Sequence, residues 1–105
     1  MGPNRYSPLG FYKVIGKSME PAYSEGDYLI VNRIAFYFRK PKKGEAVLLE
    51  DPRTGKVILK RIQAVKKQRY YVLGDNKNQS TDSRAFGWVP SEKILGNVLW
   101  RISRD

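Results

Sequence analysis

The chain has 105 residues, of which 41% are hydrophobic, and this size predicts one domain with a modest core. It contains neither cysteine nor histidine, which excludes disulfides, thiolate chemistry, an imidazole base and the commonest metal ligand. Twenty lysines and arginines face ten aspartates and glutamates, so the formal net charge is +10 and a charged partner is expected to be anionic. Any catalysis has to use a carboxylate, a lysine or a tyrosine, and we expect no metal or other cofactor.

Residues 1–10 hold two prolines and two glycines and predict an irregular lead-in, followed by a single β domain over residues 11–105. Short runs of β-branched and aromatic residues, each bounded by turn residues, predict the strands of that domain. These runs are Phe11–Ile15, Tyr28–Ile34, Glu45–Glu50, Lys56–Val65, Tyr70–Leu73 and Asn97–Ile102. They predict an all-β fold, a small single-domain barrel or sandwich of short antiparallel strands with few short helical turns.

The connections between these strands are rich in glycine, proline and aspartate. Residues 16–27 predict a turn around Ser18 with one helical turn near Pro21–Ser24. Asp51–Gly55 has the chemistry of a hairpin turn, and Gly74–Gly87 predicts a polar loop with almost no periodicity.

The connection Ala35–Gly44 begins aromatic and ends basic. We expect its three aromatic residues, Phe36, Tyr37 and Phe38, to belong to the core, although an exposed apolar rim is the alternative. Basic residues gather at Arg39–Lys43 and again at Lys66–Arg69, which favours an ordinary solvated surface, with docking on an anionic membrane surface as the alternative. No helix-turn-helix or zinc knuckle is found, so no specific nucleic acid partner is expected.

Ser18 lies in the stretch IGKSMEPAYSEGD, between a turn that contains glycine and a Met-x-Pro. A serine on a tight turn between two strands presents its hydroxyl outward on a rigid backbone, as a nucleophile requires. Serine is also an ordinary turn residue, so this stretch needs a base nearby before it indicates catalysis.

Lys60 is the candidate base. If residues 56–65 form a strand, Lys60 shares one face with Ile58, Ile62 and Ala64 and is the only polar residue of that face between positions 58 and 64. Burial penalises the ammonium form and lowers the lysine pKa, and a neutral lysine can accept a proton from a serine hydroxyl. The alternative is that Lys60 extends its ammonium group to solvent at the strand edge.

The loop GDNKNQSTDSR supplies partners for such a lysine. The hydroxyl of Ser80 could fix the direction of the amine, and Asp82 and Arg84 could pair and brace the loop. A solvated loop, polar because loops are polar, is the alternative.

Taken together, these stretches resemble the successive motifs of type I signal peptidases. The matching segments are GKSMEP at 16–21, GD at 26–27, KR at 60–61, GDN at 74–76 and STDSR at 80–84. The resemblance runs from about residue 14 to the C-terminus and implies a serine endopeptidase with a Ser–Lys dyad on an all-β fold. It implies that Ser18 is the nucleophile, that its N–H forms part of the oxyanion hole, and that Lys60 is the base. Ser80 would orient Lys60, and Asp82 and Arg84 would hold the Ser80 loop.

Two features separate the chain from many members of that family. No run of about 18 apolar residues precedes the serine, where relatives carry membrane anchors, and only Arg61–Leu73 lies where larger relatives insert a β domain. The chain thus resembles short anchorless forms, such as the maturation proteases associated with nickel-containing superoxide dismutase. We expect a cytoplasmic endopeptidase that removes an N-terminal pro-segment from a protein substrate.

Two alternatives remain open. One is the core of a membrane-associated secretory signal peptidase whose anchor is absent. The other is a non-catalytic basic β-barrel that binds nucleic acid or an anionic surface.

Overall fold

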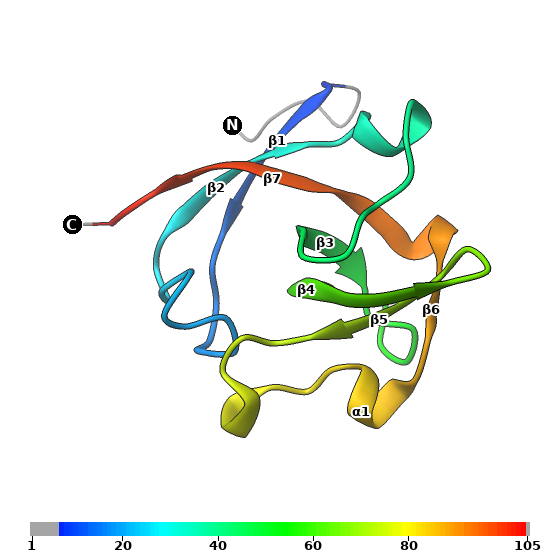
Figure 1. Cartoon of the computed structure of the whole chain (residues 1–105). Helices are drawn as coiled ribbons and strands as arrows, with labels where there is room; N and C mark the ends of the chain where they lie inside the picture. The colour runs from blue at the N-terminus through cyan, green and yellow to red at the C-terminus, as the bar shows by residue number, and fades with distance from the viewer. Residues whose placement is uncertain (1–6, 105) are drawn as a thin grey trace.

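The structure is a computed structural model that describes residues 7–104. Its strands form one antiparallel sheet in the order β1-β2-β7-β3-β4-β5-β6 (Figure 1). The strands are β1 (Leu9–Lys13), β2 (Tyr28–Asn32), β3 (Ala46–Glu50), β4 (Val57–Lys66), β5 (Arg69–Leu73), β6 (Val89–Pro90) and β7 (Ile94–Ile102). Three 3₁₀ turns, η1 (Ala35–Tyr37), η2 (Lys77–Gln79) and η3 (Ser91–Lys93), and one short helix, α1 (Ser83–Phe86), lie in the connections. The predicted all-β fold is confirmed.

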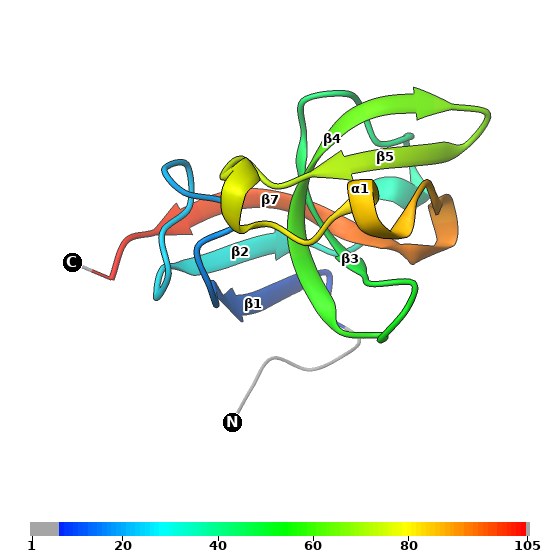
Figure 2. The ribbon, with the colours of Figure 1, turned by 90° about the horizontal axis from the view of Figure 1, so that it is seen from below.

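The sheet is strongly bent, and irregular strand pairing explains the bend. The register shifts at Ile30/Val31 where β2 pairs with β7, at Leu48/Leu49 where β3 pairs with β7, and at Ile62/Ala64 where β4 pairs with β5. An extra residue in one strand increases the local twist, so three such shifts curl the sheet into a half-barrel. Two views at right angles show β1 and β2 in one part of the bent sheet and β4 and β5 in the other (Figures 1 and 2).

The central strand β3 is buried on both faces, which explains its unbroken apolar run Ala46–Leu49. Val47 and Leu49 pack into one core with residues of β4, β5, β6 and β7. Leu48 points the opposite way and packs into a second core with Leu29 and Val31 of β2. The alternation of side chains along one strand therefore joins the two halves of the bent sheet.

The structure corrects the prediction for the aromatic loop. Phe36 packs against the first core, but Tyr37 and Phe38 are each 82% exposed, so placing all three aromatics in the core was wrong. The segment forms the 3₁₀ turn η1, in which successive side chains point about 120° apart, so one of the three faces the core.

One further prediction needs correction. The lead-in is shorter than residues 1–10, because β1 begins at Leu9; residues 1–6 lie outside the described part. The polar loop Gly74–Gly87 contains two of the short helical turns of the fold, η2 and α1, and Asp82 caps α1 by accepting from the Arg84 N–H. Between residues 7 and 104, no helix has the length and apolar character needed to cross a membrane.

Candidate active site

Ser18 lies on the long turn between β1 and β2. The turn is closed at its base, where the Val14 N–H donates to the Asp27 carbonyl at 2.8 Å and the Gly26 N–H donates to the Val14 carbonyl at 2.8 Å. Met19, next to Ser18, is buried. The chain then makes one helical turn, in which the Tyr23 N–H donates to the Met19 carbonyl at 2.9 Å. From the other side, the Asn76 N–H donates to the Ser18 carbonyl at 2.8 Å. The serine backbone is therefore held by two different segments of the chain.

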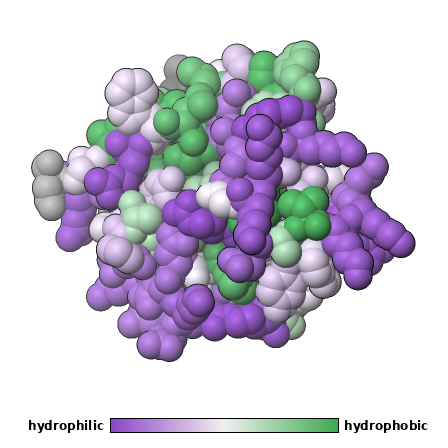
Figure 3. Space-filling view, in the orientation of Figure 1, coloured by the Kyte–Doolittle hydropathy of each residue, from purple (hydrophilic) through white to green (hydrophobic). Residues whose placement is uncertain are grey.

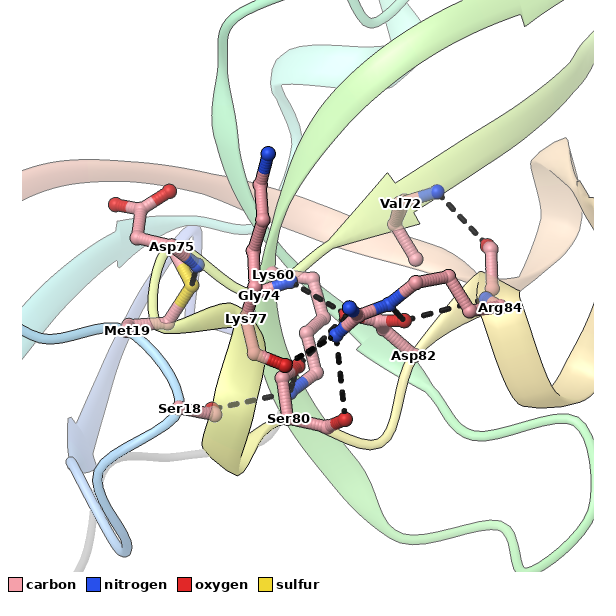
Figure 4. A network of polar contacts seen from close by, with 11 residues as sticks. Ser18, Met19, Lys60, Val72, Gly74, Asp75, Lys77, Ser80, Asp82 and Arg84 are labelled. Carbon is pink, nitrogen blue, oxygen red and sulfur yellow. Dashed lines mark hydrogen bonds and ion pairs between the residues drawn. The ribbon is translucent and has the colours of Figure 1, made fainter.

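Lys60 lies in β4, directly opposite Val47 of β3, and is only 4% exposed. The prediction of a lysine on a buried strand face is confirmed, and extension of its ammonium group to solvent is excluded. Its Nζ lies 3.0 Å from the Oγ of Ser18 and 3.1 Å from the Oγ of Ser80 (Figure 4). The structure thus brings together three residues that lie at positions 18, 60 and 80 of the sequence.

The surroundings of Lys60 favour its neutral form. Burial lowers the pKa of the amine below its ordinary value of 10.5, and the positive charge of Arg84 lowers the pKa further. The negative charges of Asp82 and Asp51 act in the opposite direction, but the net shift is downward. A lysine with a lowered pKa is a better proton acceptor near neutral pH than an exposed one.

Asp82 is the most heavily hydrogen-bonded residue of the site and is almost completely buried. Burial alone would raise the pKa of its carboxyl group, but hydrogen bonds from Arg84, the Gly74 N–H and Ser80 outweigh that effect and lower the pKa to about 2. The Arg84 Nε donates to Oδ1 at 3.0 Å, and the Gly74 N–H and the Ser80 hydroxyl donate to Oδ2 at 2.9 and 2.8 Å. Arg84 also donates to the Lys77 carbonyl at 2.8 Å and so braces the loop (Figure 4).

Three contributors to this geometry were not assigned a role from the sequence. Gly74 leaves room for the site, because a Cβ there would lie 2.6 Å from the Cβ of Ser80 and 2.7 Å from the carbonyl oxygen of Ser18. Ser83 ties the loop to β5, since its buried hydroxyl accepts from the Val72 N–H at 2.8 Å. Arg61 holds the start of the loop through two hydrogen bonds to Asp75, at 2.9 and 2.8 Å. A glycine directly after a strand is a sequence signal for a close approach, but nothing in the sequence identifies what approaches it.

Gly16 has a φ of +82°, a backbone conformation that favours glycine over other residues. A residue with a side chain would be strained in this backbone conformation, so the position two residues before Ser18 offers no side-chain donor.

A groove of about 630 Å³ runs from Ser18 and Lys60 between β1 and the first half of β4. Its walls are mainly apolar and include Tyr12, Val14, Leu48 and Ile58. Here β1 is the first strand of the sheet, and β4 pairs with β5 only from Arg61 onward, so both strands turn unpaired backbone edges toward the groove. Within residues 7–104, no three carboxylates are grouped as metal ligands.

A serine lies within hydrogen-bond distance of a buried lysine, at the end of a groove between two strands, and a neutral lysine so placed can accept a proton from the serine hydroxyl. Sequence comparison gives the family. The family described as "Signal peptidase, peptidase S26" matches residues 4–66 and 63–103, which together cover most of the chain. The chain therefore belongs to the signal peptidase family, as the resemblance of its motifs implied.

Individual relatives agree with this assignment. The mitochondrial ATP-independent inner membrane protease subunit 1b of Arabidopsis thaliana is 32% identical, over 90% of this chain and 70% of the relative. The probable signal peptidase I-1 of Synechocystis is 23% identical, over 80% of this chain and 66% of the relative. The signal peptidase I V of Bacillus subtilis is 26% identical, over 83% of this chain and 82% of the relative. The chain thus spans about two thirds of the length of the first two relatives.

Proposed function

We propose that this chain is a serine endopeptidase that removes an N-terminal segment from a protein substrate, with Ser18 as nucleophile and Lys60 as general base. The observation that carries the proposal is the 3.0 Å contact between the Ser18 hydroxyl and the amine of a buried lysine whose pKa is lowered. The family membership supports the same reaction type.

In the proposed reaction, the Ser18 oxygen attacks the carbonyl carbon of the scissile peptide bond while its proton passes to Lys60. The Ser18 N–H stabilises the negative charge that develops on the carbonyl oxygen. Lys60 then gives the proton to the departing amine, and the C–N bond breaks to leave an ester on Ser18. Lys60 next takes a proton from water, whose oxygen attacks the ester carbonyl, and the serine is released when Lys60 returns the proton.

Ser80, Asp82 and Arg84 are proposed to position Lys60. The 3.1 Å contact between Ser80 and Lys60 fixes the direction of the amine. Asp82 fixes Ser80, and Arg84 balances the charge of Asp82 while holding the loop. None of these three residues is required to touch the substrate in this mechanism.

The substrate is proposed to bind as an extended segment in the groove between β1 and β4. Unpaired strand edges on both sides offer backbone hydrogen bonds, and such bonds let one site accept different sequences. Two substrate classes fit: a soluble precursor with a short pro-segment, of which a nickel superoxide dismutase precursor is the candidate, and an exported protein with a signal segment. We favour the soluble precursor, because β4 and β5 are joined by a two-residue hairpin that leaves no room for the inserted domain of larger relatives.

The test is incubation of the full chain with purified precursors of both classes, followed by mass spectrometry of the products. We expect one new N-terminus on a cleaved precursor, and we expect Ser18→Ala and Lys60→Ala each to abolish it. Circular dichroism should show that both variants remain folded. Cleavage that persists at the wild-type rate in either folded variant would show that Ser18 and Lys60 are not the catalytic dyad.

A further inference from the structure

The loop that joins β2 to β3 exposes two adjacent aromatic side chains. We call residues 34–43 the aromatic–basic loop. Tyr37 and Phe38 are each 82% exposed, next to each other in the sequence. Apolar groups grouped on a surface in this way mark a place where a partner binds.

The outward direction of these two rings is built into the loop. On its inner side, Phe36 packs against the first core and Pro41 is buried. Arg39 stacks on Phe36 with 5.2 Å between its guanidinium carbon and the ring centre, and its Nη1 donates to Glu45 at 2.8 Å. The Phe38 N–H donates to the Ala35 carbonyl at 3.1 Å. The loop is thus fastened on both sides of the exposed pair.

The outer side of the aromatic–basic loop is positively charged. Lys40, Lys42 and Lys43 are exposed, and their side-chain amines form no ion pair or hydrogen bond with any residue between 7 and 104. Glu45, the nearest acidic residue in the sequence, is engaged by Arg39, which lowers the pKa of Glu45 and keeps it ionised. Three cations therefore flank two aromatic rings without local neutralisation.

Aliphatic side chains extend this surface. Ile34 is 38% exposed, and Leu9, which begins β1 at the same end of the sheet, is 46% exposed. The two segments are joined where the Arg33 N–H donates to the Pro8 carbonyl at 2.7 Å. Figure 1 shows the start of β1 and η1 along one edge of the molecule, and the space-filling view shows hydrophobic side chains gathered along that edge (Figure 3).

We propose that the aromatic–basic loop docks on an anionic phospholipid bilayer, with Tyr37 and Phe38 at the depth of the headgroups and the three lysines against the lipid phosphates. Aromatic rings are favoured at the membrane–water interface, and each lysine near an anionic surface adds attraction. A single-stranded nucleic acid fits this surface less well, because its bases stack on rings inside a basic groove. Tyr37 lines a hollow with Arg33 and Lys40, but Phe38 lies outside that lining and is 82% exposed.

This docking leaves the Ser18 site free. Leu9 and the aromatic–basic loop lie at one end of β1, and the turn that carries Ser18 follows the other end of the strand. The proposal does not rest on the peptidase activity and can be tested without a substrate.

The test is co-sedimentation of the full chain with vesicles of phosphatidylcholine, with and without about 30% phosphatidylglycerol. We expect binding to the anionic vesicles that weakens as salt rises from about 0.1 M to about 0.5 M, because exposed charges are screened. Tyr37→Ser with Phe38→Ser should reduce the partition coefficient at least tenfold. Replacing Lys40, Lys42 and Lys43 by glutamine should reduce it about fivefold per lysine.

Two matched controls make the result specific. Lys66→Gln, Lys67→Gln and Arg69→Gln remove the same three charges from the hairpin between β4 and β5, and they should reduce binding less than the loop variant does. Trp100→Ser removes another exposed aromatic, from the outer face of β7, where Trp100 is 68% exposed. If the hairpin variant or Trp100→Ser weakens binding as much as the loop variants, the proposal is wrong.

A second measurement does not depend on the loss of binding. A tryptophan introduced by Phe38→Trp, in a Trp88→Phe and Trp100→Phe background, should be quenched by brominated lipids in anionic vesicles. An unquenched tryptophan overturns the proposal. The proposal is also wrong if the chain binds a mixed-sequence oligonucleotide through Tyr37 and Phe38 but does not bind vesicles, since that result assigns the loop to nucleic acid.

Discussion

The carboxylate of Asp82 lies 2.8 Å from the hydroxyl of Ser80, and this contact sets the direction of the hydrogen bonds that reach Lys60. With a pKa of about 2, Asp82 is ionised and only accepts, so Ser80 gives its single hydrogen to the carboxylate. The Ser80 oxygen is then left to accept an N–H of Lys60 at 3.1 Å. In the proposed mechanism, the neutral amine of Lys60 then turns its one lone pair toward the Ser18 hydroxyl, whose oxygen lies 3.0 Å away.

Asp82→Asn tests this direction, because it keeps the shape of the side chain and changes what it can donate. An amide nitrogen in the place of Oδ2 donates to Ser80 and turns the Ser80 hydroxyl toward the lone pair of Lys60, and it also leaves the Gly74 N–H without an acceptor. An amide nitrogen in the place of Oδ1 opposes two N–H donors of Arg84, so either orientation disturbs the loop that holds Ser80. We expect kcat to fall on the order of 10²-fold, in a protein that remains folded. Arg84→Gln is the matched control, since it removes the ion pair but keeps the carboxylate. Equal losses of kcat in both variants, measured at their high-pH plateaus, would show that bracing of the loop is the whole effect.

Activity should rise with pH through the lowered pKa of Lys60, because only the neutral amine accepts a proton. Burial places that pKa below 10.5, so the rise should be complete before an exposed lysine would titrate. The charge of Arg84 lowers the same pKa, and Arg84→Gln should therefore move the rising limb to higher pH. The measurement is kcat/KM against pH for both proteins. A wild-type profile that stays flat between about pH 5 and 9 contradicts the role given to Lys60.

The burial of Lys60 could be predicted from the sequence because strand periodicity is local. Once residues 57–66 form a strand, Lys60 must share a face with Ile58 and Ile62, and the register with β3 places that face on the first core. The same reasoning failed for Tyr37 and Phe38, because a three-residue 3₁₀ turn leaves no periodic signal and its aromatic composition resembles a strand.

The contacts between distant segments could not be predicted from physical pattern alone. Whether Ser80 reaches Lys60 depends on the close approach at Gly74 and on the tie from Ser83 to Val72, and neither depends on local sequence preference. The groove depends on the order of the strands, which brings β1 and β4 to face each other although β1 ends at Lys13 and β4 begins only at Val57. The motifs of the family implied that Ser18, Lys60 and Ser80 act together, but they did not imply the close approach at Gly74 or the groove between β1 and β4.

Lys60→Met is expected to stabilise the protein near neutral pH while it abolishes activity. A buried ammonium group is costly, and methionine fills a similar volume without charge. A gain of about 1 kcal/mol would raise Tm by about 4–8 °C.

The gain should shrink as the pH rises. Between the lowered pKa of Lys60 in the folded protein and 10.5 in the unfolded chain, the unfolded chain binds the extra proton, so the stability of the wild type increases with pH. The measurement is thermal unfolding of both proteins at about pH 6 and about pH 10. A difference in Tm that is the same at the two pH values would mean that the charge of Lys60 does not limit stability.

Gly74→Ala should damage the site more than the fold. The added Cβ would meet Ser80 Oγ and would lie 2.6 Å from Ser80 Cβ and 2.7 Å from the Ser18 carbonyl oxygen, so the loop that carries Ser80 must move away from Lys60. We expect a loss of stability of about 1–3 kcal/mol, as for other overpacked sites, together with a fall in kcat on the order of 10²-fold in the folded protein. Gly96→Ala is the matched control, because its Cβ would crowd Val31 Cγ1 at 2.9 Å and the Asn32 backbone, in β2, away from Ser18 and Lys60. Both variants should unfold at lower temperature, measured by circular dichroism, but only Gly74→Ala should lose activity per folded molecule. If Gly96→Ala loses as much, general loosening of the sheet explains both results, and the close approach at Gly74 has no special part in holding Ser80 against Lys60.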